Sequence, residues 1–596
     1  MTVLACAAAA ARLFDPAPRA VVSLSLQHAA IVAAFLAVAG VARGAALRLL
    51  VAAAAAAYAV VIQAHTLSMA VVSLPADALL RLLTNRADAA AVLQQAHVSV
   101  QDGALILALV GVEVLVLAVL YRRGLRASAS AAWRRGSARV ALALVVAAVG
   151  EQALARHSDE YLGRQAVLPG YYRVFPGDVE AFAFTSDRTP EELWEPVVER
   201  VGRARNPRNV ILILLESFRY DVLGPELTPH LHALGRQSLV YTNAYAASTS
   251  TSRVWNVLLF NRPAHMFTRD REAFEAGAGS ARKGAFPVRV LRRAGYRVLV
   301  SMGCNFDWHD YRKRFVGEPP LVDRFYSSYP GHNRARHVAD DRATDRIVRW
   351  LGEPGLEKPF FLLTHLDSTH FYYFFHEDKA VARPYAGAVT TRRLLARSPG
   401  SRELLFNRYK NAVAHADFNV GRILQAVAGA GLAENTAVLV MSDHGQSFDL
   451  GSVGHLRVSE ATKRVPLMMR LPGVQAGRVE RLVTNADVFP TLFDYLQVQG
   501  LDAGLVMGRS ARSGPPRRSV LTLEAAMRQA HLTFEPFTIV FDLDSARERT
   551  LTFTPTAILD RKGQPTAGWR RTLATVPWRS ELRQILTEGQ PAPGSR

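Results

Sequence analysis

The stretch Asn-Val-Ile-Leu-Ile-Leu-Leu-Glu-Ser-Phe, Asn209 to Phe218, decides the fold of this chain. Its apolar run is unbroken, rich in branched side chains, and ends at one carboxylate, Glu216. A run of this length between polar segments predicts a strand that is buried on both faces, as in a parallel sheet. Glu216 is then expected at the carboxyl end of the strand, which is where open α/β sheets bind their ligands.

A second stretch repeats this design far downstream. The apolar run Thr436–Met441 leads directly into Ser442-Asp443-His444-Gly445. Carboxylate and imidazole groups are ligands suited to Zn²⁺ or Mn²⁺. Two core strands that end in Glu216 and in Asp443-His444 therefore predict one divalent metal site assembled across the sheet.

Composition narrows the classes of partner. The chain has 596 residues, too many for one hydrophobic core, and a formal charge of +20 that comes mainly from arginine. Such a charge fits nucleic acid or anionic lipid head groups, and apolar segments in the same chain favour lipid. We therefore expect an anionic lipid partner and no nucleic acid. The two cysteines, Cys6 and Cys304, predict no disulfide framework.

The apolar excess lies before residue 155 and predicts a transmembrane domain. Six arginines between residues 122 and 139 crowd one short loop, which is expected on the cytoplasmic side. With the N-terminus inside, a weak stretch at 66–83 counts as a span, and the chain after about residue 156 is extracytoplasmic. The alternative is an interfacial helix at 66–83 and an external N-terminus. With the stretch 66–83 counted, we expect five spans. They are 20–40, 45–63, 66–83, 103–120 and one that begins at 138–150.

The rest of the chain predicts a linker and two further parts. After residue 209, strand-like runs such as 297–301 and 360–365 alternate with helical patterns, which predicts a mostly parallel α/β sheet covered on both faces. The last part has short strand patterns that either close an edge of this sheet or form a small antiparallel sheet. The expected domains are 1–155 (transmembrane), 156–206 (juxtamembrane linker), 207–514 (α/β) and 515–596 (β-rich extension).

A hydroxyl-rich run, Ala246 to Trp255, precedes a helical segment at 254–260. Most of these hydroxyls are expected to cap the helix. One of them, next to a bound dication, would ionise at lower cost and could serve as a nucleophile and a fourth ligand. Histidines follow in the strand-end segment 364–370 and at His455, eleven residues past His444. Such histidines could hold a phosphate oxygen or protonate a leaving group.

The order of these motifs resembles that of the sulfatase-like branch of the alkaline phosphatase superfamily. The motifs are, along the chain, Glu216, the Thr/Ser run, Asp443-His444-Gly445, His455 and Thr484–Leu492. With a membrane domain in front, the chain is similar to phosphoethanolamine and phosphoglycerol transferases, including lipoteichoic acid synthases. The phrases Glu216–Asp221 and His365–His370 most resemble five-span sulfatase-like inner-membrane proteins that control lipopolysaccharide levels. Residues 205 to 500 carry the resemblance.

The resemblance implies a role for eight residues. Glu216, Asp443 and His444 match the metal ligands, and Thr251 matches the nucleophile, which also binds the metal, with Thr249 and Ser250 as alternative registers. His370 and His455 match the histidines that contact the substrate phosphate. Trp308 and Arg312, after a strand, match a head-group pocket.

The resemblance leaves two functions open. The first is a metal-dependent enzyme with Zn or Mn that moves or cleaves a phosphoethanolamine or phosphoglycerol head group through Thr251. The second is a non-catalytic sensor of lipid A, which Arg253 favours because the synthases carry an acid there. The Cys/Ser-x-Pro-x-Arg motif of true sulfatases is missing, which argues against sulfate-ester cleavage. Both functions imply a multi-pass protein of the bacterial inner membrane with a periplasmic C-terminal domain, alone or with an envelope protein partner.

Overall fold

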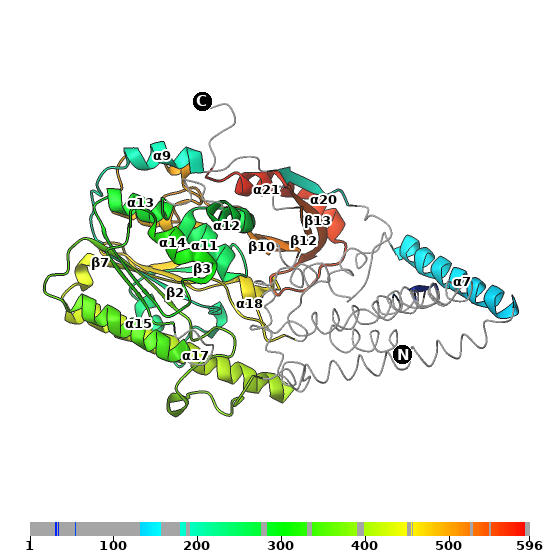
Figure 1. Cartoon of the computed structure of the whole chain (residues 1–596), viewed down its shortest axis with the longest axis horizontal. Coiled ribbons are helices and arrows are strands. Elements are labelled where there is room, and N and C mark those ends of the chain that lie inside the picture. The colour runs from blue at the N-terminus through cyan, green and yellow to red at the C-terminus, as the bar shows by residue number, and fades with distance from the viewer. Residues whose placement is uncertain are drawn as a thin grey trace.

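The architecture is taken from a computed structural model of the whole chain (Figure 1). Among the residues that it describes, no helix is both long and apolar enough to cross a membrane. The predicted spans before residue 121 lie almost wholly outside these residues, and the stretch 138–150 falls within helix α7 (Ala131–Ala155). The described residues are 131–155, 179–185, 191–275, 283–329, 336–389, 399–449, 454–455, 457–524, 528–546 and 550–589, with Ala30, Ile31, Ala34 and Ala54.

A central sheet of eight strands carries the middle of the chain, in the order β5-β4-β6-β2-β7-β8-β3-β9. β8 runs antiparallel to both of its neighbours and the other pairs are parallel, so the sheet is mixed. The strands are β2 (Asn209–Leu215), β3 (Leu239–Tyr245), β4 (Arg297–Met302), β5 (Arg324–Ser327), β6 (Phe360–Leu366), β7 (Thr436–Ser442), β8 (Leu467–Arg470) and β9 (Gly477–Thr484).

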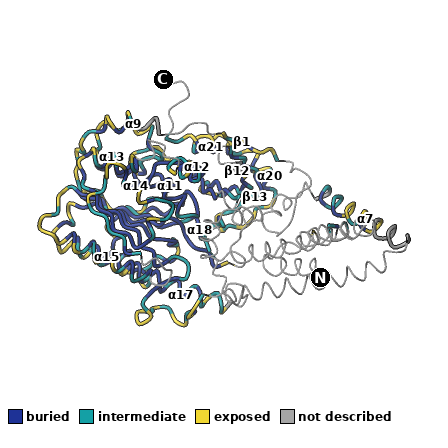
Figure 2. Tube along the Cα trace, viewed as in Figure 1, coloured by how far each residue is buried: buried dark blue, intermediate teal, exposed yellow. Residues whose placement is uncertain are grey.

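The alternation of side chains along β2 explains why the strand is apolar throughout. Val210, Leu212 and Leu214 belong to one hydrophobic core, and the intervening Ile211, Ile213 and Leu215 belong to the core on the opposite face. All seven residues are buried, as the dark central strands of Figure 2 show. Each such side chain contributes about 1.5–3 kcal/mol on burial, so this strand holds two helical layers together.

Helices cover both faces of the sheet (Figure 1). On one face lie α11 (Thr251–Phe260), α13 (Phe286–Arg293), α14 (Tyr311–Val316) and α19 (Val488–Leu496). On the other face lie α10 (Pro229–Gly235), α15 (Arg336–Leu351) and α17 (Pro399–Gly429). α13, α15 and α17 account for the helical patterns that alternate with the strand-like runs in the sequence.

The C-terminal extension forms an antiparallel sheet of its own, in the order β1-β13-β12-β11-β10. Its edge strand β1 comes from the predicted linker and pairs with β13, from Phe182 opposite Phe553 to Thr185 opposite Thr550. The elements are β1 (Phe182–Thr185), β10 (Ser519–Glu524), β11 (Gln529–Phe534), β12 (Thr538–Ala546), β13 (Thr550–Leu559), α20 (Trp569–Thr575) and α21 (Trp578–Leu586). The linker helix is α9 (Glu191–Arg200).

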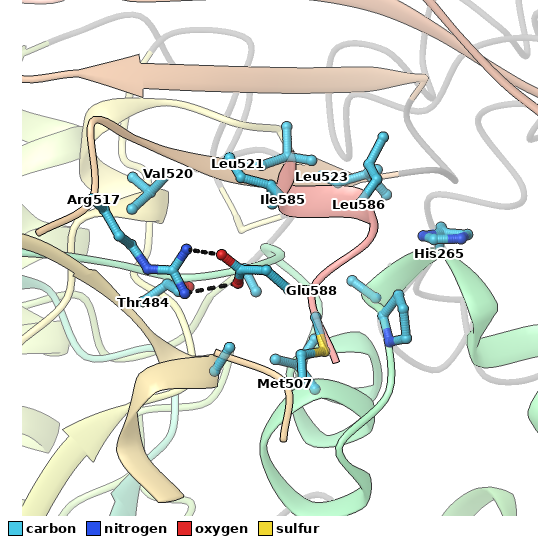
Figure 3. Close-up of a pocket in the computed structure, with 15 residues that line it drawn as sticks. His265, Thr484, Met507, Arg517, Val520, Leu521, Leu523, Ile585, Leu586 and Glu588 are labelled. Carbon is cyan, nitrogen blue, oxygen red and sulfur yellow. Dashed lines mark hydrogen bonds and ion pairs between the residues drawn. The ribbon is translucent and has the colours of Figure 1, made fainter. Parts of the chain in front are cut away.

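A cavity of about 50 Å³ lies between this second sheet and the central domain (Figure 3). Arg517 crosses the boundary beside it. Its guanidinium donates to Glu588 at 2.7 Å and to Asp487 at 2.8 Å. Because Arg517 is only 8% exposed, this buried ion pair ties the end of the chain to the central domain.

Candidate metal centre and nucleophile

The centre begins where two neighbouring parallel strands end. Leu215 of β2 lies opposite Ser442 of β7, so Glu216 and Asp443 leave the sheet side by side. Between them, Ser217 adopts φ 49°, a left-handed conformation that is uncommon outside glycine and is found at functional sites. Its amide donates to Asp443 Oδ1 at 2.9 Å and its hydroxyl to Glu216 Oε1 at 2.7 Å.

Thr251 is the first residue of α11, the helix that follows β3, and its side chain lies beside Glu216. Its Oγ1 lies 3.2 Å from Glu216 Oε2 and 3.1 Å from His444 Nε2. The free backbone N–H groups at the start of a helix favour negative charge. A hydroxyl in this position is therefore suited to becoming an alkoxide.

The other hydroxyls of the run have different contacts. Ser248 donates to Glu524 Oε2 at 2.9 Å, and Ser250 lies 3.1 Å from Ser252 Oγ. The carbonyl of Thr249 accepts from His455 Nδ1 at 2.6 Å. Among the side-chain hydrogen bonds described for this run, that of Thr251 is the one that reaches Glu216 and His444.

Hydrogen bonds orient the candidate ligands. His444 Nδ1 lies 3.0 Å from the carbonyl oxygen of Gly445, which can only accept, so Nδ1 carries the proton. The lone pair of Nε2 then faces Thr251. Asp443 Oδ2 is buried and has no hydrogen-bond partner among the described residues, whereas Oδ1 accepts from two backbone amides. A buried orphan carboxylate oxygen beside a free imidazole lone pair is what a cation site requires.

The charges of the centre are strongly coupled. Burial tends to raise the pKa of Glu216, but the hydrogen bond from His365 and the charge of His444 outweigh it and hold the pKa well below its usual value. Burial and the neighbouring charge of Glu216 raise the pKa of Asp443 well above its usual value. Burial lowers the pKa of His444, which favours the neutral ring. A bound dication would allow both carboxylates to ionise.

These residues fit a divalent metal. One ligand atom from each of Glu216, Asp443 and His444 lies within 4.8 Å of the others, and the mixed oxygen and nitrogen set suits Zn²⁺ or Mn²⁺. Thr251 Oγ1 lies beside this set at the distances given above. The geometry therefore brings together all four residues that the sequence predicts as ligands.

His365 belongs to the histidines that the sequence singles out in segment 364–370, but the sequence assigns it no ligand role. It lies at the end of β6, fully buried, with its Nε2 3.4 Å from Glu216 Oε2 and its ring edge-on to Trp255 at 5.2 Å. With Glu216 and Asp367 it forms a second, overlapping group of candidate ligands. The sequence carries the signal, because the buried run of β6 has Thr364-His365 near its end, and Glu216 directly follows β2.

The two predicted phosphate histidines lie at the rim of the centre. The His455 ring stacks on that of His444 at 4.3 Å, and burial lowers its pKa to about 4. His370 follows β6 in a turn, where its amide donates to the carbonyl of Asp367 at 3.0 Å. Burial and the charge of Arg336 lower its pKa well below the usual value, and the charge of Glu216 acts in the opposite direction.

The loop that carries His370 is held from α15. Asp340 accepts from the amides of Asp367 and Ser368, both at 2.8 Å. Arg336, one turn earlier, pairs with the Asp367 carboxylate. Burial raises the pKa of Asp340 to about 6 in spite of these hydrogen bonds.

Trp308 and Arg312 lie apart from these groups. The Trp308 ring is tilted against that of His309, with the ring centroids 4.1 Å apart. Arg312 pairs with Asp307 at 2.7 Å, its guanidinium lies over Phe325, and its side chain is 47% exposed. No contact of the described residues joins either side chain to Glu216 or Thr251, and their head-group role stays a prediction.

Arg253, which distinguishes the run from the synthases, points away from the metal ligands. Its Nε lies 3.5 Å from Glu524 Oε1, and its guanidinium donates to the carbonyl of Ala264 at 3.0 Å. Glu524 is the last residue of β10, so the second sheet holds both Ser248 and Arg253. The loop that presents Thr251 is therefore anchored by the C-terminal extension, a role that the sequence did not reveal.

Residues 208–498 match the family model described as Sulfatase. This part of the chain is a sulfatase-like domain of the alkaline phosphatase superfamily, whose members use a divalent metal. The family gives the class of the domain and leaves the metal and the substrate unspecified.

The relatives are distant. N-acetylgalactosamine-6-sulfatase of Canis lupus familiaris is 25% identical over 347 residues, 48% of this chain and 62% of that protein. Lipoteichoic acid synthase 1 of Bacillus subtilis is 24% identical over 357 residues, which are 54% of this chain and 51% of that protein. Inner membrane protein YejM of Salmonella typhimurium is 22% identical over 298 residues, 48% of this chain and 42% of that protein. The sulfatases are closer than the other two, and the chain spans less than two thirds of each of these relatives.

Among solved structures, a protein in the alkaline phosphatase superfamily from Vibrio parahaemolyticus has a TM-score of 0.46 and 17% identity, over 66% of this chain and 91% of that one. Phosphonate monoester hydrolase of Agrobacterium radiobacter has a TM-score of 0.46 and 16% identity, over 64% and 96%.

Proposed function

We propose that the chain is a metal-dependent phosphotransferase or phosphodiesterase that attacks the head-group phosphodiester of a phospholipid with Thr251. The observation that carries the proposal is the position of Thr251 Oγ1, 3.2 Å from Glu216 and 3.1 Å from His444, at the first turn of α11. A metal bound by Glu216, Asp443 and His444 would lower the cost of ionising this hydroxyl and offset charge on the phosphoryl oxygens.

The reaction takes two displacements. Thr251 Oγ1 loses its proton and forms a bond to phosphorus, while the bond from phosphorus to the diacylglycerol oxygen breaks and that oxygen takes a proton. The head group then remains on Thr251 as a phosphodiester. A hydroxyl of an acceptor, or water, attacks the same phosphorus and returns the electron pair and a proton to Thr251.

His455 and His370 suit the proton transfers at the rim. His455 donates from Nδ1 to the carbonyl of Thr249, so its Nε2 is left as an acceptor in the neutral ring. Neutral histidines with lowered pKa values can accept a proton in one displacement and return it in the next.

A phosphodiester fits the nucleophile better than a sulfate ester does. The closer relatives are named as sulfatases, but the Cys/Ser-x-Pro-x-Arg motif of true sulfatases is missing here, and this chain places Thr251 beside the ligands. The synthase relative, with its name in lipoteichoic acid synthesis, supports a phosphoglycerol donor.

The setting is part of the proposal. The charge of +20 and the apolar N-terminal stretches support a multi-pass protein of the bacterial inner membrane with this domain in the periplasm. An anionic phospholipid is the proposed donor, lipid A or another envelope molecule the acceptor, and an envelope protein a further partner.

The test uses the full chain in detergent micelles with vesicles of phosphatidylglycerol or phosphatidylethanolamine. We expect diacylglycerol release by the wild type, loss by at least about 100-fold in Thr251→Ala, and loss of both metal and release in Asp443→Asn. Thr575→Ala, an exposed threonine of α20, serves as the matched control.

Two outcomes would redirect the assignment. Release of sulfate from an aryl sulfate, with no release of diacylglycerol, would make the chain a sulfatase. Equal diacylglycerol release by wild type and Thr251→Ala, together with tight binding of lipid A vesicles, would support the non-catalytic sensor instead.

A further inference from the structure

A further group of candidate ligands, separate from the two that share Glu216, lies between α15 and α17, on the side of the sheet away from α11 (Figure 1). Asp341 lies on α15, His415 on α17, and His376 in the segment that follows β6. Asp341 Oδ2 is 2.7 Å from His376 Nε2, and Asp341 Oδ1 is 3.3 Å from His415 Nε2. One ligand atom from each residue lies within 4.8 Å of the other two.

The spacing along both helices supports a built arrangement. His337 and Asp341 are four residues apart on α15, and His415 and Asn419 are four residues apart on α17, so each pair lies on one helix face. Asn419 donates to Asp341 Oδ1 at 3.0 Å and lies 3.2 Å from His415 Nε2. Two helix faces and one loop thus direct polar atoms to a common point.

His337 brings a third imidazole to this point. Its ring centroid lies 4.6 Å from that of His376 and 5.9 Å from that of His415. Its Nδ1 is shielded from solvent and has no hydrogen-bond partner among the described residues. The three atoms that lie within 4.8 Å of one another do not include a His337 nitrogen, so this unpartnered imidazole would join as a fourth ligand only after its side chain turns toward them.

We propose that Asp341, His376 and His415, with His337 as the fourth ligand, bind a divalent cation of the zinc class. Three imidazoles and one carboxylate make up a donor set that zinc uses, and donor atoms around tetrahedral zinc lie about 3.3 Å apart. The separations of 2.7 and 3.3 Å from Asp341 need only small adjustments to reach this value. The second site shares no residue with the centre at Glu216.

The second site would act on the first through one short segment. This segment, residues 367–376, carries Asp367 and His370 in its first half and His376 at its end. Asp340, next to Asp341 on α15, already holds the amides of Asp367 and Ser368. A cation at Asp341 would fix the far end of the same segment to α15 and α17, and so brace the loop that carries His370.

The competing interpretation is a hydrogen-bonded polar network without metal, in which Asp341 accepts from His376 and Asn419. The two interpretations differ in stoichiometry. We expect the metal-stripped full chain in detergent to bind two zinc ions, measured by metal content after dialysis and by competition with a chromophoric chelator.

Variants assign each ion to its site. His376→Ala and His415→Gln should each lose the zinc ion of the second site and keep the one at Glu216. Asp443→Asn should lose the zinc ion at Glu216 and keep the one of the second site. Asn419→Ala keeps all four proposed ligands and removes the amide that contacts Asp341 and His415, so it should weaken the second site by about 10-fold or more without removing it. His232 is an exposed histidine of α10, and His232→Ala is the control for loss of a surface histidine. This variant should still bind two zinc ions.

Cobalt in place of zinc gives a readout that does not depend on activity. The wild type and Asp443→Asn should show the visible absorption of tetrahedral cobalt at the second site, and His376→Ala should lose this component. Wild-type zinc stoichiometry and affinity in both His376→Ala and His415→Gln would overturn the proposal and leave the polar network. If either variant unfolds, the Asn419→Ala affinity decides the matter, and an unchanged affinity counts against the site.

Discussion

Replacing Gly445 by alanine should displace His444 from the metal centre. The amide of Gly445 donates to the carbonyl of Thr462 at 2.7 Å, so its backbone lies against the segment 461–462. A methyl group on Gly445 would overlap the carbonyl oxygen of Ala461 and lie 3.1 Å from its carbonyl carbon and 3.3 Å from Thr462 Cα. Backbone atoms cannot rotate away, so one of the two segments has to move by about 1 Å.

The expected size follows from this movement. Overpacking of this kind costs about 1–3 kcal/mol of folding stability. A shift of about 1 Å at a catalytic group costs about 100-fold in rate. Because His444 precedes Gly445 directly, we expect a weaker metal site, with a kcat for diacylglycerol release lower by about two orders of magnitude and a smaller loss of thermal stability.

The assay compares Gly445→Ala with Gly429→Ala, at the end of α17, where a methyl group meets no atom within 4 Å. Metal content, turnover and thermal unfolding are measured on both. The control should keep all three properties. A Gly445→Ala protein with full metal content and wild-type turnover would refute the reasoning, because the position of His444 would then not depend on close contact between these backbones.

Three further substitutions test other parts of the structure. Glu524→Gln removes the charge that pairs with Arg253, and we expect lower turnover and a loss of about 2 kcal/mol in stability, with unchanged metal content. His265 is buried and its pKa is lowered to about 3 from 6.5 by burial and the charge of Arg253, so its contribution to stability is complete above pH 6.5 and is lost as the pH falls toward 3, by about 1.4 kcal/mol per unit. His265→Gln should flatten the pH dependence of urea unfolding by that slope, and an unchanged slope would contradict it. Arg517→Met should lose about 3–5 kcal/mol in the same assay, against less than about 1 kcal/mol for the exposed Arg579→Met.

The strands that carry the metal ligands could be predicted from the sequence because their signal is local. β2 and β7 are short buried runs, and each is followed directly by a charged residue, Glu216 or Asp443, that would be costly to bury without a function. Since both strands are parallel neighbours, their ends meet at one edge of the sheet. The convergence of Glu216 with Asp443 and His444 follows from these two facts.

Other features depend on contacts between distant segments and have no local pattern. The antiparallel strand β8 is only four residues long, and its direction is set by β3 and β7 on either side. Glu524 supports the loop of Thr251 from a sheet that carries no motif. The group of Asp341, His376 and His415 arises because α15 packs on α17, and neither helix reveals its partner in its periodicity.

The pairing of β1 with β13 bears on how this protein can be cut into pieces for study. A fragment that starts at residue 207 would contain the whole sulfatase-like domain and yet lose β1, which leaves residues Thr550–Phe553 of β13 with unpaired amides and carbonyls. Other molecules can add a strand to this uncovered segment, so precipitation of that fragment would say nothing about the sulfatase-like domain. A fragment that starts ahead of residue 179 keeps β1 paired with this part of β13.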